Sequence, residues 1–343
     1  MIHRQSGEEY MKSKGMFILA ICAIAAVLLA CGCTDTGTST DTEKDYISFG
    51  YQPSTHQVAY MIAKEKGWWG EDLAPYGIMD LEDHKFPTGA PEMQSMLAGD
   101  IDVAYVGAAP VISALATGLD AKIVAAVQVQ GSDLVVRPEV TYTSPEDLKG
   151  LIIATFPPGT IQDTLLRDWL QSNGINPDTD VDIRPMGPGD ATVAISEGAV
   201  DAVFLPHPAP ATIAAEGNGY TAVKSGEMEK DHACCVLVVS GDLIRNHPDM
   251  VEQIVKTHIK ATEYTIANQD EAAQIYHDMN KVDMAVIEDS FANWDGRWIT
   301  DPAIITGSVV DYTNVQADLG YIDRPLTEDE IFDLSFYQKA TEA

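Results

Sequence analysis

The side chains that carry catalysis and metal binding occur in this sequence, but not at the spacings that such sites use. There is no GxSxG turn, P-loop, GxGxxG or HExxH motif in a suitable context. His56, His207 and His232 are scattered along the chain, and none has a second ligand at metal-binding spacing. The sequence therefore predicts no catalytic residue, no metal site and no cofactor.

Of the five cysteines, only Cys234 and Cys235 belong to the predicted folded part. They begin the run Cys-Cys-Val-Leu-Val-Val, whose composition is typical of a buried strand. No CxxC motif accompanies them, and a disulfide between neighbouring residues would be strained. We interpret the pair as buried structural cysteines, with redox chemistry as the less favoured alternative.

Neutral hydrogen-bonding groups gather in loops that follow predicted strands. Ser54 and Thr55 precede one predicted helix, and Thr160 precedes another. Hydroxyls and unpaired backbone N–H groups at a helix N-terminus attract anions, although simple N-capping explains each hydroxyl equally well. The remaining candidates are the accessible backbone of Gly107 and Ala108 and the donors Gln52, Gln162 and His207. No Lys or Arg lies in these loops, so an anion would be held by neutral donors.

The elements that position these loops alternate between strand and helix, which predicts an α/β architecture. A strand at 47–51 is followed by a helix at 56–66, and a strand at 151–155 by a helix at 161–172. Residues 98–106 and 197–205 repeat a second pattern, in which a Gly-capped helix, an acidic turn and a strand follow one another.

Two such units predict two lobes with a ligand cleft at the carboxyl ends of their strands. The expected boundaries place the first part of lobe 1 at 45–135 and lobe 2 at 136–238. Residues 239–343 then return to lobe 1 as C-terminal helices. Their first stretch, 242–279, is broken at Pro248 and near 268–270, and we expect this tail to pack on lobe 1.

The N-terminus has the pattern of a lipoprotein signal. Lys12 and Lys14 precede an apolar core at 16–30, which is short for a membrane span of ~20 residues but suits a signal peptide. Leu28-Leu29-Ala30-Cys31 resembles a lipobox, so Cys31 is the expected lipidation site and Cys33 the overlapping alternative. We expect a signal peptide at 1–33 and a flexible tether at 34–44, with an uncleaved anchor helix as the alternative.

The charge balance excludes one class of partner. The sequence has 52 acidic and 21 basic residues, a net charge of −31, and such a surface repels a phosphate backbone. Nucleic-acid binding is therefore not expected, whereas a small anion remains compatible, because a local site can differ in sign from the whole surface. A solvated acidic surface, including one adapted to high salt, explains the charge better than an acidic recognition patch.

Several runs of sequence resemble the nitrate/sulfonate/taurine group of ABC-transporter solute-binding proteins, over a region from Asp45 to Gln269. The runs that carry the resemblance are Gly50-Tyr51-Gln52-Pro53, Ala63-Lys64-Glu65-Lys66-Gly67-Trp68-Trp69, residues 98–107, Pro158-Gly159-Thr160-Ile161-Gln162-Asp163, residues 197–202 and residues 234–239.

The resemblance implies a two-lobed periplasmic-binding-protein fold of the second type, with two chain crossings. It also implies a monomer that catches a small solute by hinge closure, outside the cell membrane, and delivers it to a permease and an ATPase on separate chains. The ligand contacts implied by position are Gln52, Ser54, Thr55, Gly107 and Ala108 in lobe 1, Gln128 at the hinge, and Thr160, Gln162, Asp163 and His207 in lobe 2.

The resemblance does not identify the ligand. Other members carry a tryptophan-acid-proline turn that helps to select it, and this chain has Leu205-Pro206-His207-Pro208 in its place. Two alternative functions also stay open. A pyrimidine-precursor (thiamine precursor) enzyme or binding protein shares the implied fold, but the enzyme group has a longer cysteine-rich motif than Cys234-Cys235. A sensory ligand-binding receptor would need a separate signalling partner.

Overall fold

Residues 45–342 are the part of the chain that the structure, a computed structural model, describes. The expected signal peptide, its candidate lipidation sites Cys31 and Cys33, and the expected tether all lie outside the described residues. Within 45–342, no helix combines the length and the apolar character that a membrane crossing requires.

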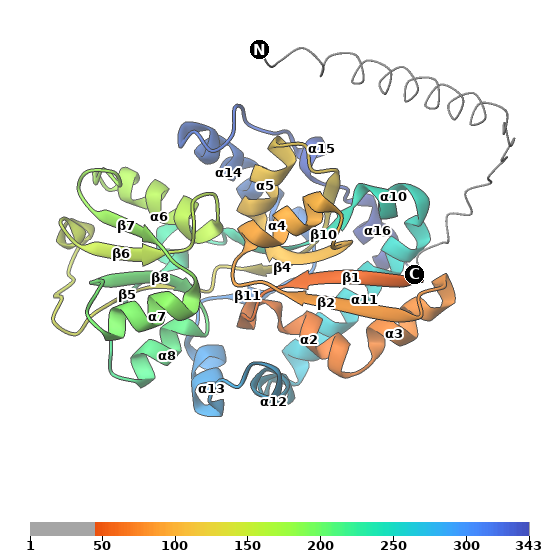
Figure 1. The fold of residues 1–343 in the computed structure, drawn as a ribbon, viewed down its shortest axis with the longest axis horizontal. Helices are drawn as coiled ribbons and strands as arrows, with labels where there is room; N and C mark the ends of the chain where they lie inside the picture. The colour runs from red at the N-terminus through yellow and green to blue at the C-terminus, as the bar shows by residue number, and fades with distance from the viewer. Residues whose placement is uncertain (1–44, 343) are drawn as a thin grey trace, which may run out of the picture. The chain divides into compact units, whose positions relative to one another are not determined.

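Two β-sheets form the framework (Figure 1), as the alternating pattern predicted. Sheet A has six strands, in the order β11 (Arg297–Trp298), β4 (Ala121–Val129), β10 (Ala233–Ser240), β3 (Val103–Gly107), β1 (Tyr46–Tyr51) and β2 (Asp80–Lys85). Sheet B has five, in the order β7 (Asp182–Pro185), β6 (Ile152–Thr155), β8 (Ala202–Pro206), β5 (Ser132–Val136) and β9 (Tyr220–Lys224). We name sheet A with its helices lobe 1, and sheet B with its helices lobe 2.

Both sheets are mixed, so an antiparallel strand begins at the edge where its neighbouring strand ends. In sheet A, β1 pairs in parallel with β2 and β3, whereas β10 runs antiparallel between β3 and β4. In sheet B, β6 pairs in parallel with β7 and β8, and β5 runs antiparallel to β8 and β9. The start of β10 therefore lies beside the end of β3, where Cys235 pairs with Gly107.

The chain crosses between the sheets earlier than the sequence indicated. It leaves sheet A after β4 and enters sheet B at Ser132, whereas the expected boundary followed residue 135. It returns before Ala233, whereas the expected boundary followed residue 238 and divided β10. β4, the crossing and β5 form one almost continuous buried run, in which the polar stretch 130–133 marks the first crossing.

Helices cover both sheets. Lobe 1 carries η1 (Thr55–Gln57), α2 (Val58–Glu65), α3 (Trp68–Leu73), η2 (Ala74–Tyr76), α4 (Gly89–Ala98) and α5 (Ala108–Ala116). Lobe 2 carries η3 (Pro145–Leu148), α6 (Ile161–Ser172), α7 (Pro188–Ser196), α8 (Ala209–Ala215) and α9 (Ser225–Met228). The two predicted Gly-capped helix ends are confirmed, because Gly99 and Gly198 follow α4 and α7 closely and have φ of 83° and 69°.

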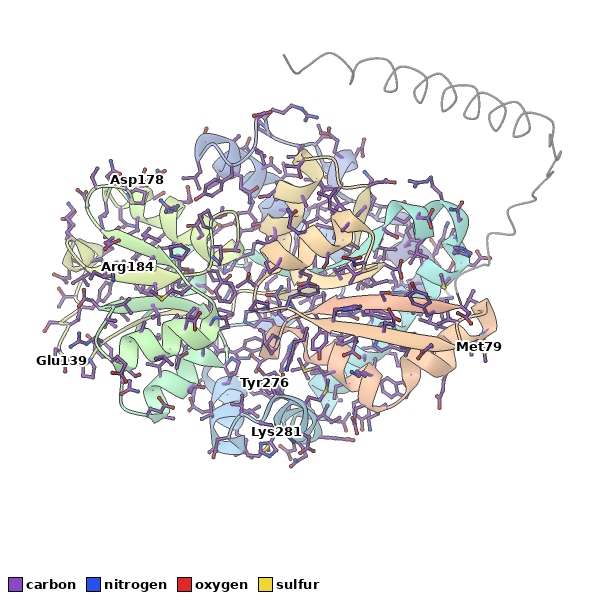
Figure 2. All side chains as sticks on the ribbon, viewed as in Figure 1. Met79, Glu139, Asp178, Arg184, Tyr276 and Lys281 are labelled. Atoms are coloured by element: carbon purple, nitrogen blue, oxygen red, sulfur yellow. The ribbon has the colours of Figure 1, made fainter. Side chains whose placement is uncertain are left out.

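The tail folds back on lobe 1, as expected, and also reaches lobe 2. Its helices are α10 (Gly241–Asn246), α11 (Pro248–Ala267), α12 (Gln269–Asn280), α13 (Met284–Asn293), η4 (Pro302–Ile304), α14 (Thr306–Asp318), α15 (Glu328–Ile331) and α16 (Ser335–Thr341). Side chains of α11, α14 and α16 enter the core of lobe 1. Tyr276 of α12, labelled in Figure 2, donates its hydroxyl to the Pro53 carbonyl (2.8 Å) and so holds the loop after β1.

The bridge to lobe 2 runs through two tail helices. Gln316 of α14 donates its side-chain amide to the carbonyls of Ala109 (3.0 Å) in lobe 1 and Gly159 (3.4 Å) in lobe 2. In α13, Ser290 contacts His207 of lobe 2. The tail thus touches both lobes next to the cleft that the sequence predicted.

Gly131 at the first crossing offers a test of the hinge. Its φ is 83°, and a Cβ atom there would lie 2.6 Å from Gln128 Nε2 and 2.8 Å from Trp294. Gly150 has almost the same φ, 84°, with nothing within 4 Å of the added atom. Gly150→Ala should lower the free energy of unfolding by about 1–2 kcal/mol, the cost of a left-handed backbone. Gly131→Ala should lower it further, because the steric clash adds to that cost.

Urea denaturation of the two variants and the parent protein measures this difference. Equal losses at the two positions would show that the crossing tolerates a side chain and that its packing is loose.

Candidate functional site

Loops from both lobes enclose a cavity of about 20 Å³, enough room for one water-sized group. Lobe 1 lines it with Gln52, Ser54, His56, Gln57, Gly89, Gly107, Pro110, Cys234 and Cys235, and lobe 2 with Phe156, Thr160, Ile161, Gln162 and Pro206. Five of the predicted contact residues are in this lining: Gln52, Ser54, Gly107, Thr160 and Gln162.

The starts of several helices meet at this cavity. Ser54 is the N-cap of η1, Gly107 of α5 and Thr160 of α6, and Gly89 is the first residue of α4. Helix starts carry unpaired N–H groups and a partial positive charge. The lining that the described residues provide contains no Lys, Arg, Asp or Glu. The cavity is therefore lined by uncharged side chains and helix starts, and the predicted role of these groups in holding a ligand stays a prediction.

The two lobes are in direct contact beside the cavity. The Ser54 hydroxyl and the Thr55 backbone N–H both donate to the backbone carbonyl of His207, at 3.1 and 3.2 Å. Thr55 itself is fully buried and does not line the cavity. These hydrogen bonds join the η1 loop of lobe 1 to the turn after β8 in lobe 2.

The two polar side chains of lobe 2 in the lining, Thr160 and Gln162, form hydrogen bonds within that lobe. Thr160 Oγ1 donates to the Pro157 carbonyl (2.7 Å) and accepts from the Asp163 N–H (3.4 Å), so it caps α6. Gln162 donates through Nε2 to Ser132 Oγ (3.1 Å). Each side chain is held in place by these bonds before any ligand contact.

Asp163 and Ala108 lie outside the cavity lining. Asp163 is buried, forms an ion pair with Arg167 (2.8 Å) and accepts a hydrogen bond from Tyr321 (2.6 Å). It anchors the start of α6, which is a structural role. Ala108 is buried as the first residue of α5.

The imidazole of His207 is not part of the cavity lining. Its Nδ1 lies 2.9 Å from Ser290 Oγ, and its Nε2 lies 3.5 Å from Asp133 Oδ2. The sequence favoured ligand contact by this side chain, but in the structure the cavity is lined by the preceding Pro206, and His207 contributes its carbonyl to the contact between the lobes.

Gln128 lies at the hinge, as expected, and is fully buried. Its Nε2 donates to the carbonyls of Val129 (2.7 Å) and Gln130, which places the side chain against the crossing and not in the cavity lining. Among the described atoms, its Oε1 has no hydrogen-bond partner.

Four polar or sulfur-bearing lining residues were not among the predicted contacts: His56, Gln57, Cys234 and Cys235. His56 was expected inside a helix, and the cysteines were assigned to lobe 2. Only the antiparallel insertion of β10 between β3 and β4 brings the cysteines to η1. No local pattern encodes such a pairing. The one available signal is the presence of two adjacent cysteines at the start of a predicted strand, which makes them candidates for a site.

A buried carboxyl group is hydrogen-bonded to one side chain of the cavity lining. Glu92 of α4 is completely buried, and burial raises its pKa well above the usual value, although a hydrogen bond from Gln52 Nε2 (2.8 Å) opposes this shift. Burial thus favours the protonated form of Glu92, whose Oε2 accepts the hydrogen bond that holds the Gln52 amide.

Replacing Glu92 tests this assignment. A carboxyl whose pKa is raised in the folded protein stabilises the fold fully below its unfolded value of 4.5, and this contribution is lost as the pH rises toward the folded value. Glu92→Gln keeps the shape and cannot ionise. Its free energy of unfolding should therefore rise relative to the parent as the pH increases above 4.5 toward the raised pKa of the folded state.

Urea titrations at several pH values give this difference, and Glu82→Gln, at an exposed position of β2, serves as the control. If the free energy of unfolding of Glu92→Gln instead fell relative to that of the parent with rising pH, Glu92 would be ionised in the folded protein.

The sequence is similar to proteins of known name over most of its length. A protein of Bacillus subtilis (strain 168), named for the binding of aliphatic sulfonates, is 28% identical, with 96% of this chain and 97% of that protein covered. The nitrate/nitrite binding protein NrtA of Nostoc sp. (strain PCC 7120) is 25% identical, with 80% and 72% covered.

Among solved structures, the periplasmic nitrate-binding protein NrtA from Synechocystis PCC 6803 superposes with a TM-score of 0.77. The two sequences are 19% identical, and the match covers 88% of this chain and 89% of that protein. This likeness shows that the fold is that of a periplasmic binding protein. The sequence matches the NMT1-like family over residues 40–277, more than half of the chain, and the protein is thus a member of the NMT1-like family.

Proposed function

We propose that the protein is the extracytoplasmic solute-binding component of an ABC importer, and that it captures a small anion or organic solute such as nitrate, a sulfonate or taurine. The observation that carries the proposal is the meeting of helix starts from both lobes at one cavity with an uncharged lining. Such an arrangement stabilises a negative charge by dipoles and neutral donors.

The relatives support this role. A protein named for aliphatic sulfonates and one named for nitrate and nitrite match this chain over most of its length. Both names describe binding, so we propose that this chain also binds its solute and releases it unchanged. Nitrate and sulfonates share a small, monovalent group of oxygen atoms, which suits a site with neutral donors.

Hinge closure is the proposed mechanism. A solute that touches lobe 1 at Gln52 and Ser54 and lobe 2 at Thr160 and Gln162 gains contacts that only the closed form provides, so binding shifts the population toward that form. Because the cavity has room for one water-sized group, a solute must part the lobes to enter. The permease and its ATPase, on separate chains, would then recognise the closed form.

The remaining assignments follow from this role. We propose that a lipid on Cys31 or Cys33 holds the protein at the outer face of the cell membrane, and that it acts as a monomer. Neighbouring genes for a permease and an ATPase would favour transport over a sensory role.

A thermal-shift screen of the full chain in detergent identifies the solute. The panel contains nitrate, bicarbonate, taurine, alkanesulfonates, aromatic sulfonates and pyrimidines. A solute at 100 times its dissociation constant should stabilise the folded protein by about 2.7 kcal/mol. We expect one of the anionic classes to raise the melting temperature. A shift with pyrimidines alone would instead favour a thiamine-precursor protein, and no shift with any compound would contradict capture of these solutes.

A matched pair of variants tests the cavity itself. Gln162 lies in the first turn of α6 and lines the cavity, whereas Gln171 is exposed near the end of the same helix. Gln162→Leu should weaken binding of the identified solute about tenfold to a hundredfold, because it removes a donor to a charged group, worth about 1.5–3 kcal/mol. Gln171→Leu should leave the affinity unchanged.

Isothermal titration calorimetry measures both affinities, and melting without solute confirms that each variant is folded. Equal affinities for the two variants would place the binding site elsewhere.

A further inference from the structure

Three potential metal ligands meet in the wall of the cavity. His56 Nδ1 lies 3.4 Å from Cys234 Sγ and 3.8 Å from Cys235 Sγ, and the two sulfur atoms are 3.8 Å apart. All three residues are buried, with at most 5% of any of them exposed. In the part of the chain that the structure describes, this is the one group of three such residues with ligand atoms within 4.8 Å of one another.

The imidazole is oriented for coordination. His56 Nε2 lies 2.7 Å from the Gly131 carbonyl, which can only accept a hydrogen bond. Nε2 therefore carries the proton, and the lone pair of Nδ1 faces the two sulfur atoms. Histidine ligands of metal ions are commonly held in this way, with the second ring nitrogen donating to a backbone carbonyl.

A bulge in β10 places both sulfur atoms on the same side. Neighbouring residues of a regular strand point to opposite faces of the sheet. Here the pairing with β4 shifts register on both sides of Cys235, so that Cys234 and Cys235 both reach His56. Bulges of this kind re-aim side chains and are common beside functional sites.

The spacing of the three atoms fits one metal ion. A tetrahedral ion with metal–sulfur bonds of about 2.3 Å and a metal–nitrogen bond of about 2.0–2.1 Å separates two sulfurs by about 3.8 Å and sulfur from nitrogen by about 3.5 Å. The observed separations are 3.8 Å between the sulfurs and 3.4 and 3.8 Å to the nitrogen. The donors are thus preformed for coordination without a change of the backbone.

We propose that His56, Cys234 and Cys235 bind one thiophilic metal ion, and that Zn²⁺ is the ion that this spacing suits best. Two sulfurs and one imidazole form a donor set that zinc accepts, with a fourth position left open. The open position faces the cavity, because all three residues line it. Binding releases the thiol protons, and the two thiolates then balance the charge of the ion. This proposal does not rest on the proposed transport role, although the metal ion and the solute would share one cavity.

The test uses the full chain in detergent, with Cys22, Cys31 and Cys33 replaced by serine, so that Cys234 and Cys235 are its only thiols. Titration with Zn²⁺ against a chromophoric chelator should give one tight site per chain, and Co²⁺ in its place should produce sulfur-to-cobalt charge-transfer absorption. Cys234→Ser and Cys235→Ser should each weaken Zn²⁺ binding more than tenfold. His84→Gln, which removes an exposed histidine, should not change it.

X-ray absorption of the Zn²⁺-loaded protein provides a readout that needs no substitution at the cluster. The proposal expects two sulfur neighbours and at least one nitrogen in the first shell. A shell of oxygen and nitrogen alone, or Zn²⁺ affinity that is the same in both serine variants as in the parent, would overturn it.

Discussion

The backbone of Gly131 connects lobe 1, lobe 2 and the tail at the first crossing. Its carbonyl accepts hydrogen bonds from the His56 ring of lobe 1 (2.7 Å) and the His207 N–H of lobe 2 (3.1 Å), and its N–H donates to Asp295 of the tail (2.9 Å). Trp294 and Gln128 press against the space that a side chain would need. The crossing, the wall of the cavity and the orientation of His56 thus depend on one residue that must lack a side chain.

The contacts between the lobes combine hydrogen bonds with apolar packing, because Ile161 of α6 in lobe 2 belongs to the hydrophobic core of lobe 1. Ser54 and Thr55 reach a single backbone carbonyl across the cleft. Hydrogen bonds of this kind contribute about 0.5–1.5 kcal/mol each, because water replaces them when they break. These hydrogen bonds therefore add little to the cost of opening the cleft, whereas the burial of Ile161 against lobe 1 adds an apolar contact that opening must break.

The sequence predicted the elements well, because their signals are local. The Gly caps at Gly99 and Gly198, the helix start at Thr160 and the break at Pro248 all depend on a few neighbouring residues. Five of the ten residues predicted as ligand contacts line one cavity, and their contact with a ligand stays a prediction. What remained hidden depends on distant pairing: the insertion of β10 into sheet A and the orientation of the His207 ring. Neither leaves a trace in the residues nearby.

The uncharged lining of the cavity sets a limit on valence. An ion that enters must shed its water shell, and the energy of this dehydration grows steeply with its charge. Helix ends contribute partial charges of about half a unit each, enough to compensate one negative charge but a poor substitute for a counter-ion against two. For the small anion proposed above, the cost of dehydration would favour a monovalent over a divalent ion before shape has any influence.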